Sequence, residues 1–181
     1  TFNGNEWDYV KDTLDSTFVS SVGKYVDRFE EMLADYTGTK RAVAVVNGTA
    51  ALHVGLRLIG VQSGDEVIIP SLTFVATANA VSYLHAVPHF VDCEYTSMGL
   101  DAEKLELYLQ DILEVRDGVP VNKHTKRLIR AIVPMHTFGH PLDMDPLMEV
   151  SAKLNVPVLE DAAESLGSFY KATHTGNFGR L

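Results

Sequence analysis

Residues 43–52 read Val-Ala-Val-Val-Asn-Gly-Thr-Ala-Ala-Leu, and this stretch decides the fold that the sequence predicts. Its apolar, β-branched first half predicts a buried strand at 42–46, and a helical pattern begins at residue 49, directly after Asn47-Gly48. A helix that starts in this way presents free backbone N–H groups and its positive dipole end, which favour an anion such as phosphate. The alternative is a tight strand–helix turn without a ligand, since such turns recur in many α/β proteins.

The composition limits the classes of protein that fit. The 181 residues suffice for one sizeable core or part of a larger one, and 46% hydrophobic with 22% charged residues is typical of a globular protein. A net charge of −9 without a long basic run argues against nucleic acid as a partner. The single cysteine, Cys93, excludes an intrachain disulfide, and no apolar run reaches the roughly 18 residues of a membrane span. We therefore expect a cytoplasmic protein that binds neither nucleic acid nor membrane.

Strands alternate with helices along most of the chain. After two N-terminal helices, strands are predicted at 42–46, 66–70, 88–91, 128–134 and 156–160. Helical patterns begin at residue 49, cover 74–84, follow Asp101 and cover 146–154, while 114–126 reads as a polar excursion with a turn at Asp117-Gly118. This order predicts an α/β fold with a mostly parallel sheet and helices on both faces.

The residues that could bind a ligand or take part in chemistry follow the ends of the predicted strands. Ligands of such sheets bind beyond the carboxyl ends of the strands. Gly48 and Thr49 follow the first predicted strand, Phe74 follows the second, and Asp161 follows the fifth. We therefore expect a phosphorylated heteroaromatic cofactor, with its phosphate at the helix start, its ring on Phe74 and its ring nitrogen at a carboxylate.

Asp161 is the most informative of these residues. It follows an apolar strand pattern and precedes Ala162-Ala163, so its surroundings should be buried, where a lone ionised carboxylate is costly. A protonated pyridine nitrogen would remove that cost. The alternatives for Asp161 are a helix N-cap or a buried salt bridge, and the alternative for Phe74 is a core position.

Other cofactor and metal sites find less support. His136 and His140 are four residues apart, but Gly139 and Pro141 argue against the helix that such a metal site would need. The sequence also lacks the G-x-G-x-x-G fingerprint of dinucleotide-binding proteins. We expect no metal.

Four co-linear motifs resemble the DegT/DnrJ/EryC1/StrS family of pyridoxal-phosphate-dependent sugar aminotransferases. The matching segments are Asn47–Leu52 (NGTAAL), Gly64–Pro70 (GDEVIIP), Thr73–Ala80 (TFVATANA) and Glu160–Gly167 (EDAAESLG). The resemblance runs from about Val19 to Gly179. It implies the large domain of fold type I, the aspartate aminotransferase-like fold, with 1–40 as an N-terminal helical segment and 41–181 as a partial cofactor-binding domain. Residues 134–145 further resemble the branch that makes 4-amino sugars of the bacillosamine or legionaminate type.

The resemblance also implies a role for each matching residue. The backbone around Gly48, Thr49 and Ala50 would hold the phosphate of pyridoxal 5′-phosphate. Phe74 matches the position that stacks on the ring, and Asp161 matches the carboxylate that pairs with the pyridinium nitrogen.

The remaining implications concern the reaction and the assembly. Glu164 matches a position where the family has Gln or Glu near the cofactor's 3-hydroxyl group. The implied reaction transfers an amino group, with glutamate as donor, to a keto-sugar nucleotide, converting a 4-keto-6-deoxy sugar to a 4-amino sugar for surface-glycan biosynthesis. A homodimer with a shared active site is implied as well.

One feature of the family is missing from the sequence. The family's Schiff-base lysine follows a Gly-x-x-Gly turn, which matches 176–179 here, and the sequence stops two residues later at Leu181. Lys171 precedes the turn and does not match. We therefore expect an N-terminal portion of an aminotransferase, trimmed at both ends and inactive alone. The alternatives are a sugar dehydratase of the same family, in which histidine replaces that lysine, and a non-catalytic cofactor-binding or interaction module.

The missing lysine generates a first prediction. We expect the 181-residue chain, incubated with pyridoxal phosphate and then borohydride, to give no stable lysine adduct, because none of its lysines has the matching context. Mass spectrometry of the treated chain measures the adduct, with an established aminotransferase as positive control. A stoichiometric adduct would contradict the expectation.

Overall fold

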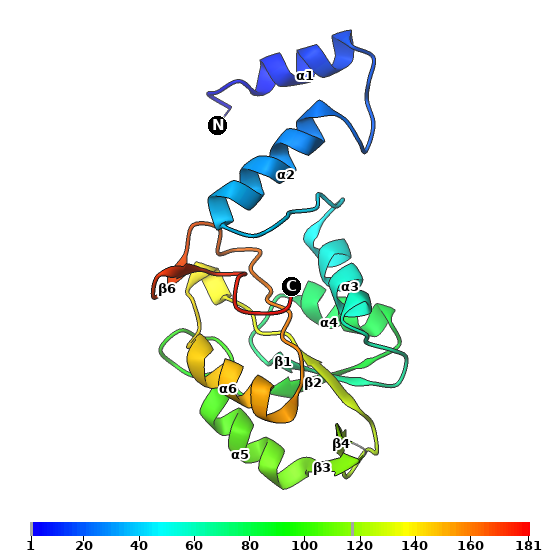
Figure 1. Ribbon diagram of the computed structural model, residues 1–181, viewed down its shortest axis with the longest axis vertical. Helices are drawn as coiled ribbons and strands as arrows, with labels where there is room; N and C mark the ends of the chain where they lie inside the picture. Colours follow the sequence, from blue (N-terminus) through cyan, green and yellow to red (C-terminus); the bar gives the residue numbers. More distant parts are fainter. Residues whose placement is uncertain (1, 117) are drawn as a thin grey trace. The chain divides into compact units, whose positions relative to one another are not determined.

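The computed structural model describes residues 2–116 and 118–181, and the chain divides into two compact units, Thr1–Ala44 and Val45–Leu181. The first unit contains α1 (Glu6–Asp15) and α2 (Lys24–Thr37) (Figure 1). Helix α2 ends at Gly38, whose φ of 77° is the left-handed conformation that favours glycine. None of the helices in the described part of the chain is both long and apolar enough to cross a membrane.

The second unit is built on a parallel sheet with the strand order β2-β1-β5. Its elements, in chain order, are α3 (Gly48–Leu58), β1 (Glu66–Pro70), α4 (Val75–Tyr83), β2 (Val87–Val91), α5 (Ala102–Ile112), β3 (Leu113–Arg116), β4 (Val119–Asn122), β5 (Ile129–Ile132), the 3-10 turn η1 (Thr137–Gly139), α6 (Met144–Leu154), β6 (Phe169–Tyr170) and β7 (Thr173–His174). The strands predicted at 66–70, 88–91 and 128–134 are confirmed, the last in a shorter form.

The strand predicted at 42–46 is wrong. These residues carry no strand in the structure, and Val43 and Val46 are 77% and 87% exposed. A strand needs a neighbouring backbone, and among the described residues none pairs with this segment. The backbone N–H of Ala44 instead donates to the carboxylate of Glu30 at 2.7 Å.

Two other segments differ in detail from the sequence prediction. Residues 156–161 lie beside β5 but form isolated parallel bridges, Ile132 with Val158 and Met135 with Asp161. Pro134 and Pro157 have no N–H to donate, so the pairing is interrupted between the two bridges and does not extend before the first. The excursion at 114–126 contains the antiparallel hairpin of β3 and β4. The predicted turn includes Gly118, whose φ is 78°, and Asp117, which lies outside the described residues.

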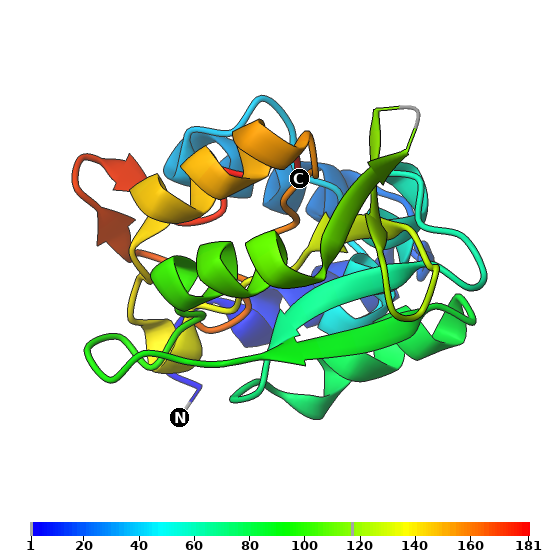
Figure 2. The ribbon, with the colours of Figure 1, turned by 90° about the horizontal axis from the view of Figure 1, so that it is seen from below.

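Helices cover both faces of the sheet, as the alternating pattern predicted (Figure 2). Adjacent residues of a strand point to opposite faces. Ile68 accordingly packs with apolar side chains of α5 and α6, while Val67 and Ile69 pack with those of α3 and α4. The two clusters bury β1 on both sides and fix the sheet edge at which its carboxyl end emerges.

Helix α3 offers a matched test of this packing. We expect Leu56→Ala to lower the free energy of unfolding by about 2–5 kcal/mol, because it leaves a cavity in a tight core. Leu56 is 1% exposed, whereas Leu58, two residues further along the same helix, is 70% exposed. Leu58→Ala should therefore change the free energy by less than about 0.5 kcal/mol. Urea unfolding followed by circular dichroism measures both values, and equal losses would contradict the assigned burial.

Candidate functional site

Asp161 lies at the carboxyl end of the segment that runs beside β5. Its backbone N–H donates to the carbonyl of Pro134 at 2.9 Å, and its carbonyl accepts from the N–H of His136 at 3.1 Å. The buried side chain accepts a 2.6 Å hydrogen bond from the hydroxyl of Thr77 at Oδ2 and a 3.4 Å bond from the N–H of Ala163 at Oδ1. Within the described residues Asp161 has no ion pair, and no helix begins after it. It is therefore neither part of a buried salt bridge nor a helix N-cap, the two alternatives considered from the sequence.

The first turn of α4 faces this carboxylate. Thr77 lies in that turn, and the hydroxyl of Thr73 donates to the Thr77 hydroxyl at 3.1 Å. The backbone N–H of Phe74 donates to Sδ of Met135 at 3.3 Å, and Met135 is bridged to Asp161. These contacts bring the ends of β1 and β5 together with the predicted ring partner and the predicted carboxylate.

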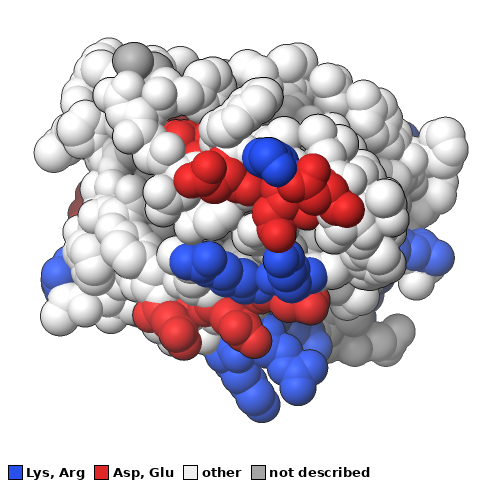
Figure 3. All heavy atoms as spheres, turned by 90° about the horizontal axis from the view of Figure 1, so that it is seen from above, with Lys and Arg blue, Asp and Glu red and all other residues white. Residues whose placement is uncertain are grey.

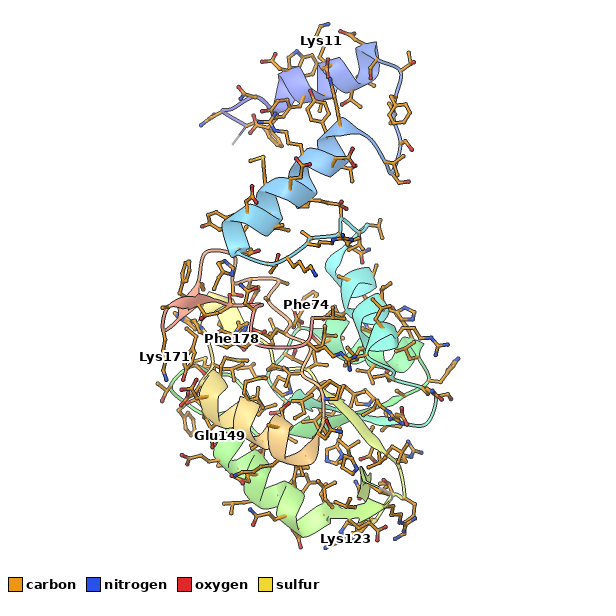
Figure 4. The ribbon with its side chains drawn as sticks, in the orientation of Figure 1. Lys11, Phe74, Lys123, Glu149, Lys171 and Phe178 are labelled. Atoms are coloured by element: carbon orange, nitrogen blue, oxygen red, sulfur yellow. The ribbon has the colours of Figure 1, made fainter. Side chains whose placement is uncertain are left out.

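The ring of Phe74 is not part of the core. Its side chain is 65% exposed, and Figure 4 labels it in the second unit, where α4 begins. Phe74 thus belongs to neither core cluster of the described residues, and one face of its ring is open.

The start of α3 retains the features of an anion site. Asn47 caps the helix, with its side-chain Oδ1 accepting the N–H of Ala50 at 2.8 Å. The N–H of Ala51 donates to the carbonyl of Asn47, while the described residues supply no acceptor for the N–H groups of Gly48 and Thr49. Two donors and the positive dipole end are thus left for an anion, and the N–H of Ala50 is already used by the cap.

A close approach brings α3 to the strand that carries Asp161. A Cβ added at Gly55 would lie 3.0 Å from Cδ1 of Leu159, two residues before Asp161. Glycine at this position lets the helix pack tightly on Leu159. The helix start and the carboxylate therefore belong to one packed unit.

Glu164 is exposed and contacts the turn that follows β5. Its Oε2 accepts the N–H of Phe138 at 2.8 Å, within η1. A Cβ at Gly139 would lie 2.8 Å from the carbonyl oxygen of Glu164, so this approach requires glycine. Glu164 thus lies at the same sheet edge as Asp161, with one carboxylate oxygen engaged by the protein.

Glu160 is the last residue of the predicted strand at 156–160, His136 follows the one at 128–134, and the sequence assigned neither a role in the site. Their side chains are fully buried and meet at 3.0 Å. Glu160 also accepts the backbone N–H groups of Gly176, Phe178 and Gly179 at 2.6 to 2.8 Å. Adjacent side chains of an extended segment point to opposite sides. The adjacency of Glu160 and Asp161 in the sequence therefore indicated that the two carboxylates contact different parts of the protein.

The pKa of Glu160 reflects competing effects. Burial raises it, but the hydrogen bonds from His136 and from the backbone N–H groups of 176–179 hold the pKa of this carboxyl below its ordinary value of 4.5. Glu160 is therefore ionised at neutral pH and fixes the 176–179 turn against the strand end.

Charge elsewhere on the chain is mixed. On the face drawn in Figure 3, acidic and basic side chains lie in adjacent groups. In the first unit Lys11 pairs with Asp15 and Lys24 with Asp12. Among residues 2–116 and 118–181, no group of three or more His, Cys, Asp or Glu is arranged to hold a metal ion.

Comparison with known proteins identifies relatives over the whole chain. A model of the "DegT/DnrJ/EryC1/StrS aminotransferase family" matches residues 2–181. GDP-perosamine synthase of Caulobacter vibrioides is 44% identical over 98% of this chain and 43% of its own length. GDP-perosamine synthase of Escherichia coli O157:H7 is 39% identical over 100% of this chain and 45% of its own length. The chain thus spans less than half the length of these relatives.

A solved structure shares the fold. DesV of S. venezuelae, determined in complex with a ketimine intermediate, is 32% identical with a TM-score of 0.79. The match covers 94% of this chain and 42% of DesV.

The Glu160 cluster generates a prediction on stability. Glu160→Gln should lower the free energy of unfolding at pH 7 by about 2–4 kcal/mol, because an amide N–H₂ would then face backbone N–H donors in a buried site. The control Glu106→Gln removes only a surface pair with Lys153 and should cost less than about 1 kcal/mol.

The same variant should change the pH dependence of stability. A carboxyl whose folded pKa is depressed contributes stability above its unfolded pKa and loses it as the pH falls through the folded value. The gap between wild type and Glu160→Gln should therefore be largest above about pH 4.5 and shrink below it. Urea midpoints measured from pH 3 to 7 test this, and a gap that widens on acidification would contradict it.

Proposed function

Because the chain belongs to the DegT/DnrJ/EryC1/StrS aminotransferase family, we propose that it forms part of a pyridoxal-phosphate-dependent aminotransferase that acts on a keto-sugar nucleotide. In this proposal residues 1–40 are an N-terminal helical segment and 41–181 belong to the cofactor-binding large domain. The enzyme is cytoplasmic, and it is a homodimer with a shared active site.

The single observation that carries the proposal is the exceptional environment of Asp161. Four carboxylate residues are buried among the described residues, and three lie against an Arg or His side chain: Asp65 against Arg130, Glu66 against His89 and Glu160 against His136. Asp161 has only the neutral donors Thr77 and Ala163. A buried carboxylate of this kind is stabilised by a cation from outside the chain, and a protonated pyridine nitrogen fits that need.

The other residues proposed to contact the cofactor lie at the same edge of the sheet. The free N–H groups of Gly48 and Thr49, in the turn shaped by Ala50 and Asn47, suit a phosphate. The exposed ring of Phe74 offers a stacking face, and Glu164 supplies a carboxylate for the region of the 3-hydroxyl group. Bound there, pyridoxal phosphate supplies the electron sink for amino-group transfer.

The chain's own residues bind and orient. With the cofactor bound, Asp161 would pair by its negative charge with a protonated ring nitrogen, the start of α3 would hold the phosphate, and Phe74 would offer its ring for stacking. The lysine that the family requires belongs, in this proposal, to the segment that follows the 176–179 turn.

The substrate class rests on the relatives. Both curated relatives bear the name GDP-perosamine synthase, which supports a GDP-linked sugar as substrate. We propose a 4-keto-6-deoxy sugar as the acceptor, glutamate as the amino donor, and a 4-amino sugar for surface glycans as the product.

An assay of the intact protein tests the proposal. The protein is loaded with pyridoxal phosphate and incubated with glutamate and a GDP-4-keto-6-deoxy sugar, and mass spectrometry follows the sugar. We expect the ketone to be replaced by an amine. Loss of water without gain of nitrogen would instead identify a dehydratase, and absence of cofactor binding would leave a non-catalytic module.

Substitution of Asp161 tests its proposed role in amino transfer. Asp161→Ala in the intact protein should reduce amino transfer by several orders of magnitude while the circular dichroism spectrum stays unchanged, because the ring nitrogen loses its counter-charge. The control Asp111→Ala removes an exposed carboxylate on α5 and should leave turnover unchanged. Near-normal turnover of Asp161→Ala would remove Asp161 from the cofactor site.

A further inference from the structure

Two hydroxyl groups lead from the end of β1 to Asp161. Thr73 precedes α4 and donates its hydroxyl hydrogen to the hydroxyl of Thr77 at 3.1 Å. Thr77, buried in the first turn of α4, donates to Oδ2 of Asp161 at 2.6 Å. Met135 Sδ lies 3.3 Å from the Thr73 hydroxyl and is a second, weaker acceptor for it.

The direction of these hydrogen bonds follows from chemistry. An ionised carboxylate has no hydrogen to give, so Thr77 is the donor to Asp161. Its single hydrogen is then used, and its oxygen can only accept from Thr73. The hydroxyl of Thr77 is thereby held in one orientation, with its hydrogen aimed at the carboxylate.

The two oxygens of Asp161 are left unequal. Oδ2 has the short bond from Thr77, whereas Oδ1 has only the 3.4 Å contact with the N–H of Ala163. The positive end of the α4 dipole lies on the side of Thr77, since Thr77 is in the first turn of that helix. Oδ1 is therefore the oxygen with the greater acceptor capacity for a ligand.

We propose that Thr77 is a positioning residue that orients the Asp161 carboxylate and leaves Oδ1 for the protonated ring nitrogen of the cofactor. This inference rests on the proposed function, and it adds to it a residue outside the cofactor's own contacts. Thr73 supports Thr77 by supplying the hydrogen that its oxygen accepts.

The test compares variants of the intact protein loaded with ¹⁵N-labelled pyridoxal phosphate. The ¹⁵N chemical shift of the ring distinguishes a protonated from a neutral nitrogen, and cofactor affinity is measured by fluorescence. Thr77→Ala and Thr77→Ser both remove the γ-methyl group and differ in the hydroxyl, so this pair separates the hydrogen bond from packing. Because this hydrogen bond is made to a charged group, its loss is expected to weaken cofactor affinity by roughly tenfold.

We expect Thr77→Ser to keep the wild-type chemical shift and affinity. Thr77→Ala should bind about tenfold more weakly and shift the ring signal towards that of the neutral nitrogen. Thr73→Val, which leaves the Thr77 donor in place, should have a smaller effect than Thr77→Ala. The control Ser82→Ala, which removes an exposed hydroxyl from the same helix, should have none.

The outcomes separate this inference from the proposed function. If wild-type protein binds the cofactor and Thr77→Ala matches Thr77→Ser in chemical shift and affinity, the positioning role is overturned and the proposed function stands. If the wild-type protein binds no pyridoxal phosphate, the proposed function fails, and the role of Thr77 fails with it.

Discussion

The carboxylate of Glu160 connects the segments that meet at the sheet edge of the candidate site. It joins His136, which follows β5, to the turn at 176–179, and its own backbone belongs to the segment beside β5. The side chains of Glu160 and His136 are buried and the turn is partly buried, so these hydrogen bonds replace ones that water would otherwise supply. Figure 4 labels Phe178, one of the residues of the turn that Glu160 holds. Without this carboxylate, three backbone N–H groups and Nε2 of His136 would lose their partner at the edge where the candidate site forms.

The extended backbone at this edge gives the neighbouring residue a different role. Asp161 follows Glu160, so its side chain points to the opposite side, towards α4. The backbone bonds of Asp161 to Pro134 and His136 keep it in register with β5, and Glu160 keeps the same strand end fixed from the other side. The position of Asp161 therefore depends on Glu160, whose carboxylate is engaged by His136 and the backbone of the 176–179 turn.

The sequence predicted this arrangement unevenly, for physical reasons. The strand at 66–70 was predictable because burial on both faces selects a continuous apolar run, and those at 88–91 and 128–134 because each keeps several apolar residues between turn signals. The strand at 42–46 has the same kind of run, but strand formation also requires a pairing backbone, which a local pattern cannot show. Asp161 and Phe74 could be placed at strand ends by topology alone.

The hydrogen-bond partners of Glu160 and Asp161 could not be predicted from the sequence. Glu160 meets His136 across 24 residues, and Thr77 meets Asp161 across 84. Spacing in the sequence carries no information on such pairs, because they are set by the packing of β5 and α4 on the sheet.

The contrast between Glu160 and Asp161 explains how a buried site can be both stable and open to a ligand. A fully compensated carboxylate, such as Glu160, stabilises the fold but has no acceptor capacity to offer. A carboxylate with no compensation would make the unliganded fold costly. Asp161 lies between these limits: one oxygen has the hydroxyl of Thr77, the other has a single long contact, and no Lys, Arg or His side chain among the described residues pairs with it. The hydrogen bond from Thr77 offsets part of the cost of burying the charge, and in the proposed function a cationic ring nitrogen would offset the rest.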